Sequence, residues 1–153
     1  MTLPDPLYIL NFFIVFLFSL SVHESAHAWT SERFGDDTGR TLGRISLNPI
    51  VHIDPVGTVL FPLMGLFGGF GFGWAKPVPV NPMNWREKDK ANFWVSAAGP
   101  ISNVIIAVIV FCVLKSLLLL QVVQFRDLLI PGDGVWYPIG QLMILAIQLN
   151  VVL

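Results

Sequence analysis

Long apolar stretches alternate with short polar ones along the chain. Apolar residues fill positions 7–29, 91–123 and the region from about 135 to 153. About 20 helical residues, at 1.5 Å per residue, cover the hydrocarbon core of a bilayer, which is roughly 30 Å thick. The pattern therefore predicts helices that span a membrane, with residues 7–29 broken only by a few polar side chains.

The hydrophobic segment 56–75 differs from the others because it contains six glycines and Pro62. Such a sequence forms a poor continuous helix, and irregular backbone is tolerated in lipid only where protein or water covers it. We expect a kinked span or a segment that enters the membrane and returns on the same side. The fold predicted is an all-α polytopic membrane protein with about three to four transmembrane segments.

The polar stretches contain extended and turn signals. Residues 41–47 alternate weakly between polar and apolar and stop at Asn48-Pro49, which predicts a short β-strand and a turn. Residues 76–82 contain three prolines and are expected to be extended, and residues 85–90 form a charged interfacial stretch. Residues 124–134 are expected to form a polar turn.

Basic residues suggest an orientation in the membrane. None precedes the first apolar stretch, whereas three arginines follow it within residues 30–55. The positive-inside rule then places the N-terminus outside. The stretch 76–90 carries four basic and two acidic residues, and both loops can lie inside only if segment 56–75 re-enters. The N-terminus lacks the features of a cleavable signal, so the first helix is expected to stay in the mature protein.

Composition excludes some partners. Hydrophobic residues make up 54% of the chain and charged residues 12%, with a net charge of −1, against roughly 25% charged residues in soluble domains. No basic cluster suggests nucleic acid, so the expected surroundings are a lipid bilayer. The single cysteine, Cys112, cannot form an internal disulfide and is expected to serve packing.

One short string carries the chemistry, His23-Glu24-Ser25-Ala26-His27. Helical residues four apart share a face, so both imidazoles can reach one ion. Glu24 is free to take a proton from a water that zinc activates, and to pass it to a leaving amine. A pair of structural polar residues is the alternative, but ionisable residues inside a membrane span are costly and usually functional. We therefore predict one Zn²⁺ per chain, with His23 and His27 as ligands and Glu24 as general base.

A catalytic zinc site has three protein ligands and one open position, and the spacing supplies only two, His23 and His27. A third histidine six residues further on is absent, because that position is Arg33. His52 and Asp54 remain candidates, although His52-Ile53-Asp54-Pro55 also looks like an Asp-Pro turn.

Beyond these residues the chain resembles the site-2 proteases, which are polytopic intramembrane zinc metalloproteases, and in particular their compact prokaryotic branch without a PDZ insertion. Besides the His-Glu-His string, the resemblance rests on Gly43-Arg44-Ile45-Ser46-Leu47-Asn48-Pro49, His52-Ile53-Asp54-Pro55-Val56-Gly57-Thr58, Gly73-Trp74-Ala75-Lys76-Pro77-Val78-Pro79-Val80 and Ala97-Ala98-Gly99-Pro100-Ile101-Ser102-Asn103. It implies a multi-pass protein of a prokaryotic cell membrane that hydrolyses peptide bonds of membrane-protein or peptide substrates.

The chain departs from the family at one point. The family takes its third ligand from an aspartate in an Asn-x-x-Pro…Asp-Gly motif, which this sequence lacks; residues 141–153 resemble only the approach to it. We therefore expect residues 1–153 to be one membrane-embedded metalloprotease domain, truncated at its C-terminus. A catalytically inactive relative that binds membrane proteins is the main alternative, and an ion or metal carrier is a further one.

The remaining motifs have structural and functional interpretations. Gly99-Pro100 is expected near the start of the longest helix, where small residues allow close packing. Asn103 either lines the site or forms an interhelical hydrogen bond. Residues 76–80 or 42–47 could hold a substrate segment by strand addition. The oligomeric state is left open.

Overall fold

The computed structural model describes residues 5–68, 73–130 and 134–153, and these ranges contain helices but no β-strand. The elements, in chain order, are α1 (Pro6–Arg33), α2 (Thr38–Thr41), η1 (Pro49–His52), η2 (Pro55–Leu60), α3 (Phe61–Gly68), η3 (Pro82–Asn84), α4 (Lys88–Leu119), α5 (Phe125–Leu129) and α6 (Trp136–Val152). The all-α prediction is confirmed for these residues.

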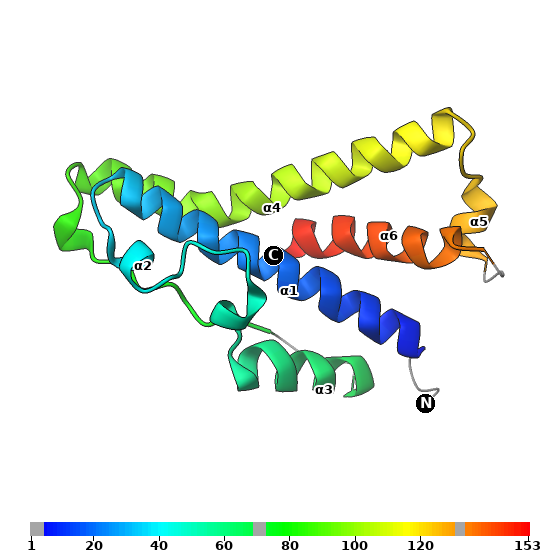
Figure 1. Ribbon diagram of the computed structural model, residues 1–153, viewed down its shortest axis with the longest axis horizontal. Coiled ribbons are helices and arrows are strands. Elements are labelled where there is room, and N and C mark those ends of the chain that lie inside the picture. Colours follow the sequence, from blue (N-terminus) through cyan, green and yellow to red (C-terminus); the bar gives the residue numbers. More distant parts are fainter. Residues whose placement is uncertain (1–4, 69–72, 131–133) are drawn as a thin grey trace.

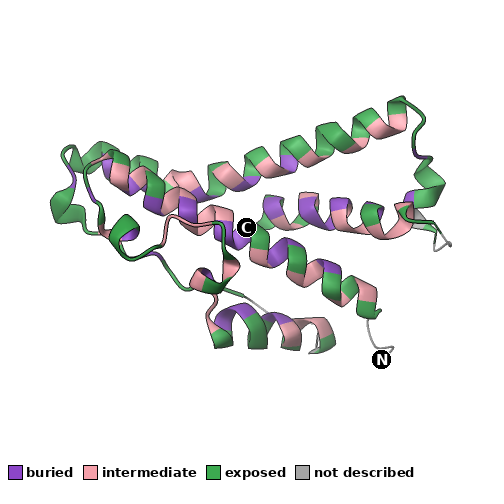
Figure 2. Cartoon of the chain, viewed as in Figure 1, coloured by how far each residue is buried: buried purple, intermediate pink, exposed green. Residues whose placement is uncertain are grey.

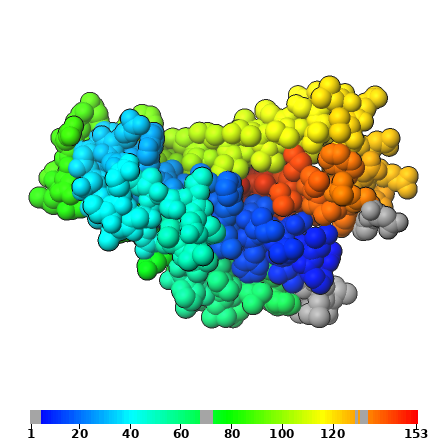
Figure 3. Space-filling view, viewed as in Figure 1, coloured from blue at the N-terminus to red at the C-terminus, as the bar shows by residue number. Residues whose placement is uncertain are grey.

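The bundle consists of three long helices. α1 packs on α4 along its C-terminal half and on α6 along its N-terminal half, and α6 also packs on α4. Figure 1 shows α1 and α4 diverging from one end of the molecule, with α6 in the angle between them. Figure 3 shows the same wedge with side chains filled in, where α6 lies between α4 and the start of α1.

α1 begins and ends at clear sequence signals. The Asp5 carboxylate accepts a hydrogen bond from the Leu7 amide at 3.1 Å, and Pro6 occupies the first helical position, where its missing N–H costs nothing. The helix ends before Gly35, whose φ of +108° favours glycine. It is therefore longer than the apolar stretch 7–29 that predicted it.

α1 carries a row of polar residues that contact its neighbours. Asn11, Ser19, His23, His27 and Ser31 are spaced by multiples of four, and because the helix has 3.6 residues per turn this row winds slowly around it. The Asn11 amide donates to the Pro138 carbonyl, and the Ser19 hydroxyl accepts from the Asn150 amide of α6. Interhelical hydrogen bonds of this kind hold helices together where lipid removes the hydrophobic drive for association.

α4 exposes most of its apolar surface. Side chains from Ile101 to Val113 that face outward are 44–57% exposed, and Figure 2 shows exposed residues along most of the helix, whereas buried residues gather on α1 and α6. Such a surface is expected in lipid rather than water. α1 and α4 are long and apolar enough to cross a membrane, while Pro55–Phe67 and α6 are shorter apolar helices. The expected number of three to four spans therefore stays a prediction.

The predicted β-strand at residues 41–47 is wrong. The chain there forms the end of α2, a turn in which Gly43 has a φ of +66°, and irregular backbone. The Ser46 backbone N–H and C=O both pair with the Ser25 hydroxyl of α1 rather than with another strand. The turn expected at Asn48-Pro49 is confirmed: the Asn48 side chain caps η1.

The glycine-rich segment leaves and returns to one place. It starts as the π-helical turn η2 and continues as α3; residues 69–72 lie outside the described ranges. Beyond them the Trp74 amide donates to the Gly57 carbonyl at 3.0 Å, and the Lys76 amide donates to the His52 carbonyl at 2.9 Å. Its two ends are thus adjacent, as an entering and returning segment requires.

Two further expectations are corrected. Gly99-Pro100 does not open the longest helix, because α4 already begins at Lys88 and encloses Pro100. The charged stretch 85–90 supplies its first turn, with Asp89 favourable near the positive helix end. The polar turn at 124–134 contains a short helix, α5. Residues 76–81 are extended, as predicted, without a strand partner.

Candidate metal centre

Two histidines from consecutive turns of α1 form the centre of the site. His23 and His27 lie with ring centroids 4.7 Å apart and ring planes inclined by 72°. Their positions follow from helix periodicity, because residues four apart lie one above the other. Both rings face α4.

Gly99 of α4 faces both rings. A Cβ placed on Gly99 would lie 2.4 Å from Nε2 of His23 and 2.4 Å from Nε2 of His27. The two Nε2 atoms therefore lie within twice that distance of each other, at most 4.8 Å. Two imidazoles on a tetrahedral zinc ion, with bonds of about 2.0–2.1 Å, have nitrogens about 3.4 Å apart. The pair is compatible with one shared ion, and the absent side chain of Gly99 leaves it room.

The other ring nitrogen of each histidine has a partner on α4. His27 Nδ1 lies 2.6 Å from the Val95 carbonyl oxygen, and His23 Nδ1 lies 3.0 Å from the Asn103 amide nitrogen. Outer partners of this kind orient metal-binding histidines in proteins. Asn103, expected either to line the site or to bond between helices, forms an interhelical hydrogen bond to His23.

Glu24 is held by the backbone of another segment. Its Oε2 accepts a hydrogen bond from the Val78 amide at 3.0 Å. Val78 is buried between Pro77 and Pro79, so the extended segment 76–81 lies against this turn of α1. In the Glu24 carboxylate, next to the histidine pair, Oε2 is therefore held by the Val78 amide, whereas Oε1 is not bonded to Val78.

A buried carboxylate anchors the far end of that segment. Asp36 is fully buried and accepts hydrogen bonds from the Asn81 amide at 2.7 Å and from Ser31 and Thr38. Burial raises the pKa of Asp36, but the hydrogen bonds from Thr38, Asn81 and Ser31 lower it more, to about 2. The carboxylate thus stays ionised at neutral pH and ties the end of α1 to residue 81.

His52 and Asp54 lie in contacts of their own. His52 Nε2 is 2.8 Å from the Ser46 carbonyl oxygen and 3.5 Å from the Ser25 hydroxyl, and Ser25 is on the opposite face of α1 from the histidine pair. Asp54 accepts from the amides of Val56 and Gly57 and caps η2. Among the described residues no group of three His, Cys, Asp or Glu side chains could hold a metal.

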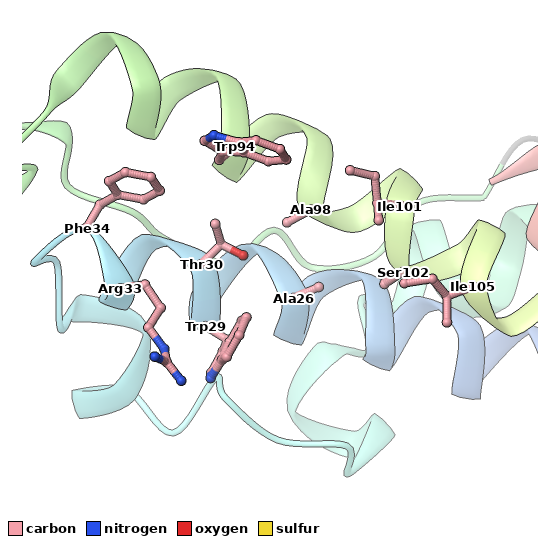
Figure 4. Close-up of a pocket in the computed structure, with 10 residues that line it drawn as sticks. All are labelled: Ala26, Trp29, Thr30, Arg33, Phe34, Trp94, Ala98, Ile101, Ser102 and Ile105. Atoms are coloured by element: carbon pink, nitrogen blue, oxygen red, sulfur yellow. The ribbon is translucent and has the colours of Figure 1, made fainter.

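An apolar groove of about 500 Å³ runs between α1 and α4, beside His23 and His27. Figure 4 shows Ala26 and Ala98, each next in sequence to a residue of the site, with Trp29 and Trp94 further along the two helices. The Arg33 guanidinium lies 4.6 Å from the Trp29 ring centroid. The groove lies on the outer surface of the bundle.

Sequence reasoning missed three contributors. The Gly99 gap could have been found, because Gly99 and Asn103 repeat on α4 the four-residue spacing of the histidines on α1. The Val95 carbonyl and the Val78 amide are backbone groups, for which the sequence carries no specific signal. Together the residues fit a divalent zinc ion: two convergent imidazole nitrogens, a cleared space and a neighbouring carboxylate.

Comparison with known proteins gives an independent result. The sequence model of Peptidase family M50 matches residues 11–149. The chain is 44% identical over 110 residues to "Putative zinc metalloprotease YwhC" of Bacillus subtilis (strain 168), covering 71% of this chain and 48% of that protein. It is 38% identical over 95 residues to "Putative zinc metalloprotease Rip2" of Mycolicibacterium smegmatis, covering 61% and 35%.

"Putative zinc metalloprotease Rip2" of Mycobacterium tuberculosis is 30% identical over 102 residues, covering 66% of this chain and 38% of that protein. The chain thus spans about half or less of the length of these relatives. No solved structure matches. Because the family match covers almost the whole sequence, the chain belongs to peptidase family M50, the site-2 protease family.

Proposed function

We propose that this chain forms the zinc-binding part of an intramembrane metalloendopeptidase that hydrolyses membrane-protein or peptide substrates. The observation that carries the proposal is the convergence of His23 and His27 Nε2 on the space left by Gly99, with Glu24 on the same turn of α1. The relatives are named as zinc metalloproteases, and imidazole nitrogens suit zinc.

In this proposal His23 and His27 bind the ion through Nε2, and α4 orients both rings through their Nδ1 atoms. When bound, zinc supplies a Lewis acid that lowers the pKa of a water molecule toward about 7. The free oxygen of Glu24 accepts a proton from the attacking water, and Glu24 then donates it to the leaving amine. The Val78 amide restricts rotation of the carboxylate during both transfers.

No third zinc ligand lies beside the histidine pair among the described residues. A catalytic zinc site has three protein ligands, and the described residues offer the histidine pair alone. His52 is turned toward Ser46, and Asp54 already caps η2. We therefore propose neither as a ligand, and assign both to holding the loop that leads into the glycine-rich segment.

The extended segment 76–80 positions Glu24 rather than adding a substrate strand. Strand addition uses alternate N–H and C=O groups along one edge. Pro77 and Pro79 have no N–H, and the amides of Lys76 and Val78 already donate to His52 and Glu24. The segment therefore has few donors left for a substrate.

We also propose a multi-pass topology in which the loops after α1 and before α4 share one side of the membrane. The Arg86 amide donates to the Phe34 carbonyl at 2.9 Å, and Asn81 is bonded to Asp36. Because these bonds join the two loops directly, segment 56–75 returns to the side from which it left. Cysteine-labelling of both loops on the same face of sealed vesicles tests this; labelling from opposite faces would overturn it.

Glu24→Gln tests the proposed catalysis in proteoliposomes containing tagged single-span membrane proteins as probe substrates. We expect cleavage to fall about 100- to 10,000-fold, the usual contribution of a general base, with zinc affinity unchanged. Glu32→Gln is the matched control, because Glu32 is a carboxylate of the same helix that pairs with Arg40 outside the site. Wild-type cleavage by Glu24→Gln would overturn the assignment, and a wild type that binds zinc without cutting any probe would indicate a binding protein.

A further inference from the structure

One face of α4 contributes three consecutive turns to the histidine pair. Val95, Gly99 and Asn103 are spaced by four and so lie in line along the helix. The Val95 carbonyl contacts His27 Nδ1, Gly99 faces both Nε2 atoms, and Asn103 contacts His23 Nδ1. α4 therefore faces all four ring nitrogens of the pair, and its two polar groups, the Val95 carbonyl and the Asn103 amide, decide which of these nitrogens carry protons.

A neutral imidazole carries one proton, on Nδ1 or on Nε2, and binds a metal through the nitrogen without it. For His27 the choice is fixed, because the Val95 carbonyl can only accept and therefore requires a proton on Nδ1. Its Nε2 then has a free lone pair facing Gly99. For His23 the partner is an amide, which can either donate or accept.

The orientation of the Asn103 amide therefore sets the proton on His23. With Nδ2 toward His23, the ring nitrogen Nδ1 must accept and the proton sits on Nε2, where it blocks metal binding. In that orientation Oδ1 is buried without a hydrogen-bond partner, and the residue is 0% exposed. The two ends of an amide have the same shape, so a half-turn exchanges them and brings Oδ1 to the position 3.0 Å from Nδ1.

We propose that Asn103 is a positioning residue whose Oδ1 accepts the Nδ1 proton of His23 and thereby presents the Nε2 lone pair toward Gly99. This inference rests on the proposed zinc site. It makes the pair symmetric: each histidine donates from Nδ1 to an oxygen of α4, and both Nε2 atoms are free to bind the ion. The amide nitrogen of Asn103, Nδ2, then occupies the place of the unpartnered oxygen.

Two substitutions separate the hydrogen bond from packing. Asn103→Leu keeps a similar volume and removes the acceptor, whereas Asn103→Asp keeps an acceptor and has no donor when ionised. The matched control is Asn150→Leu. Asn150 is also a buried asparagine that bonds to α1, through Ser19 at 2.8 Å, and it too has an unpartnered Oδ1. Its hydrogen bonds go to Ser19 and to the Ala146 carbonyl, and neither involves a histidine.

The experiment measures two properties of each variant in detergent micelles. The first is the zinc dissociation constant, by competition with a chelator. The second is the tautomer of His23 in metal-free protein labelled with ¹⁵N-histidine, at a pH of about 8, above the ordinary histidine pKa of about 6.5. A His23→Gln variant assigns its signals.

We expect metal-free wild type and Asn103→Asp to carry the His23 proton on Nδ1, and Asn103→Leu to lose this preference. We expect Asn103→Leu to weaken zinc binding about 10- to 100-fold, as for other outer-shell partners, while Asn103→Asp and Asn150→Leu bind within a few-fold of wild type. A wild-type proton on Nε2, or an Asn103→Leu variant unchanged in both properties, would overturn the inference. Absence of zinc binding by wild type would instead count against the proposed function, and the tautomer would still decide the role of Asn103.

Discussion

Adding one methyl group at Gly99 is the smallest change that tests the candidate metal centre. In Gly99→Ala the new Cβ would lie 2.4 Å from both Nε2 atoms, where ordinary contacts begin at 3.4 Å. Each ring would therefore have to retreat by about 1.0 Å, the difference between these distances. Metal–ligand distances are sharply defined, to about 0.2 Å, so the two nitrogens could no longer meet one ion.

The effect on folding is expected to be smaller than the effect on the metal. Alanine stabilises a helix interior by about 1 kcal/mol relative to glycine, whereas overpacking a close contact costs about 1–3 kcal/mol. The net loss of stability is thus about 0–2 kcal/mol. Zinc affinity should fall by about 10- to 100-fold or more, because losing the outer partners that orient metal-binding histidines already has an effect of that size.

Zinc titration and thermal unfolding of the purified protein check both expectations. Gly140→Ala is the control, because its Cβ would lie 2.7 Å from a Leu128 methyl carbon and perturb a helix contact without touching a histidine. It should lose stability and keep its zinc affinity. Wild-type zinc affinity in Gly99→Ala would refute the idea that the ion lies between the histidines and Gly99.

Further predictions concern the groups around the site. Val78→Pro removes the amide that holds Glu24 within a run that is already proline-rich, and we expect cleavage to fall about 10-fold or more as the carboxylate loses its orientation; Val78→Ala, which keeps the N–H, should retain most of the rate. Asp36→Asn should destabilise the protein by about 2 kcal/mol, because a pKa of about 2 against an ordinary 3.8 corresponds to that free energy. Since the folded-state pKa is the lower one, this stability is complete above about pH 4 and is lost as the pH falls toward 2, and Asp36→Asn should lack that part of the acid dependence in unfolding measurements. Ser25→Ala should loosen loop 44–52, seen as faster proteolysis there, and leave zinc affinity unchanged, because Ser25 faces away from the histidines.

Much of this arrangement could be predicted because helix periodicity is a local property. The His23–His27 spacing gives a shared face whatever the rest of the chain does, and the long apolar stretches gave α1 and α4 to within a few residues.

Other features depended on contacts between distant segments. The alternation at residues 41–47 suggested a strand, but the backbone N–H and C=O of Ser46 bond to Ser25 on α1 instead. Gly99-Pro100 suggested a helix start, although charged residues before it extend α4 back to Lys88. The hold of the Val78 amide on Glu24 spans 54 positions and uses backbone, so no side-chain pattern could have indicated it.

Zinc K-edge X-ray absorption on the purified protein loaded with one equivalent of zinc tests the central claim most directly. We predict scattering from two imidazoles with nitrogens at about 2.0–2.1 Å, and one imidazole fewer in His27→Ala. A wild-type spectrum without imidazole scattering, or one that His27→Ala leaves unchanged, would contradict the assignment of His23 and His27 as the metal ligands.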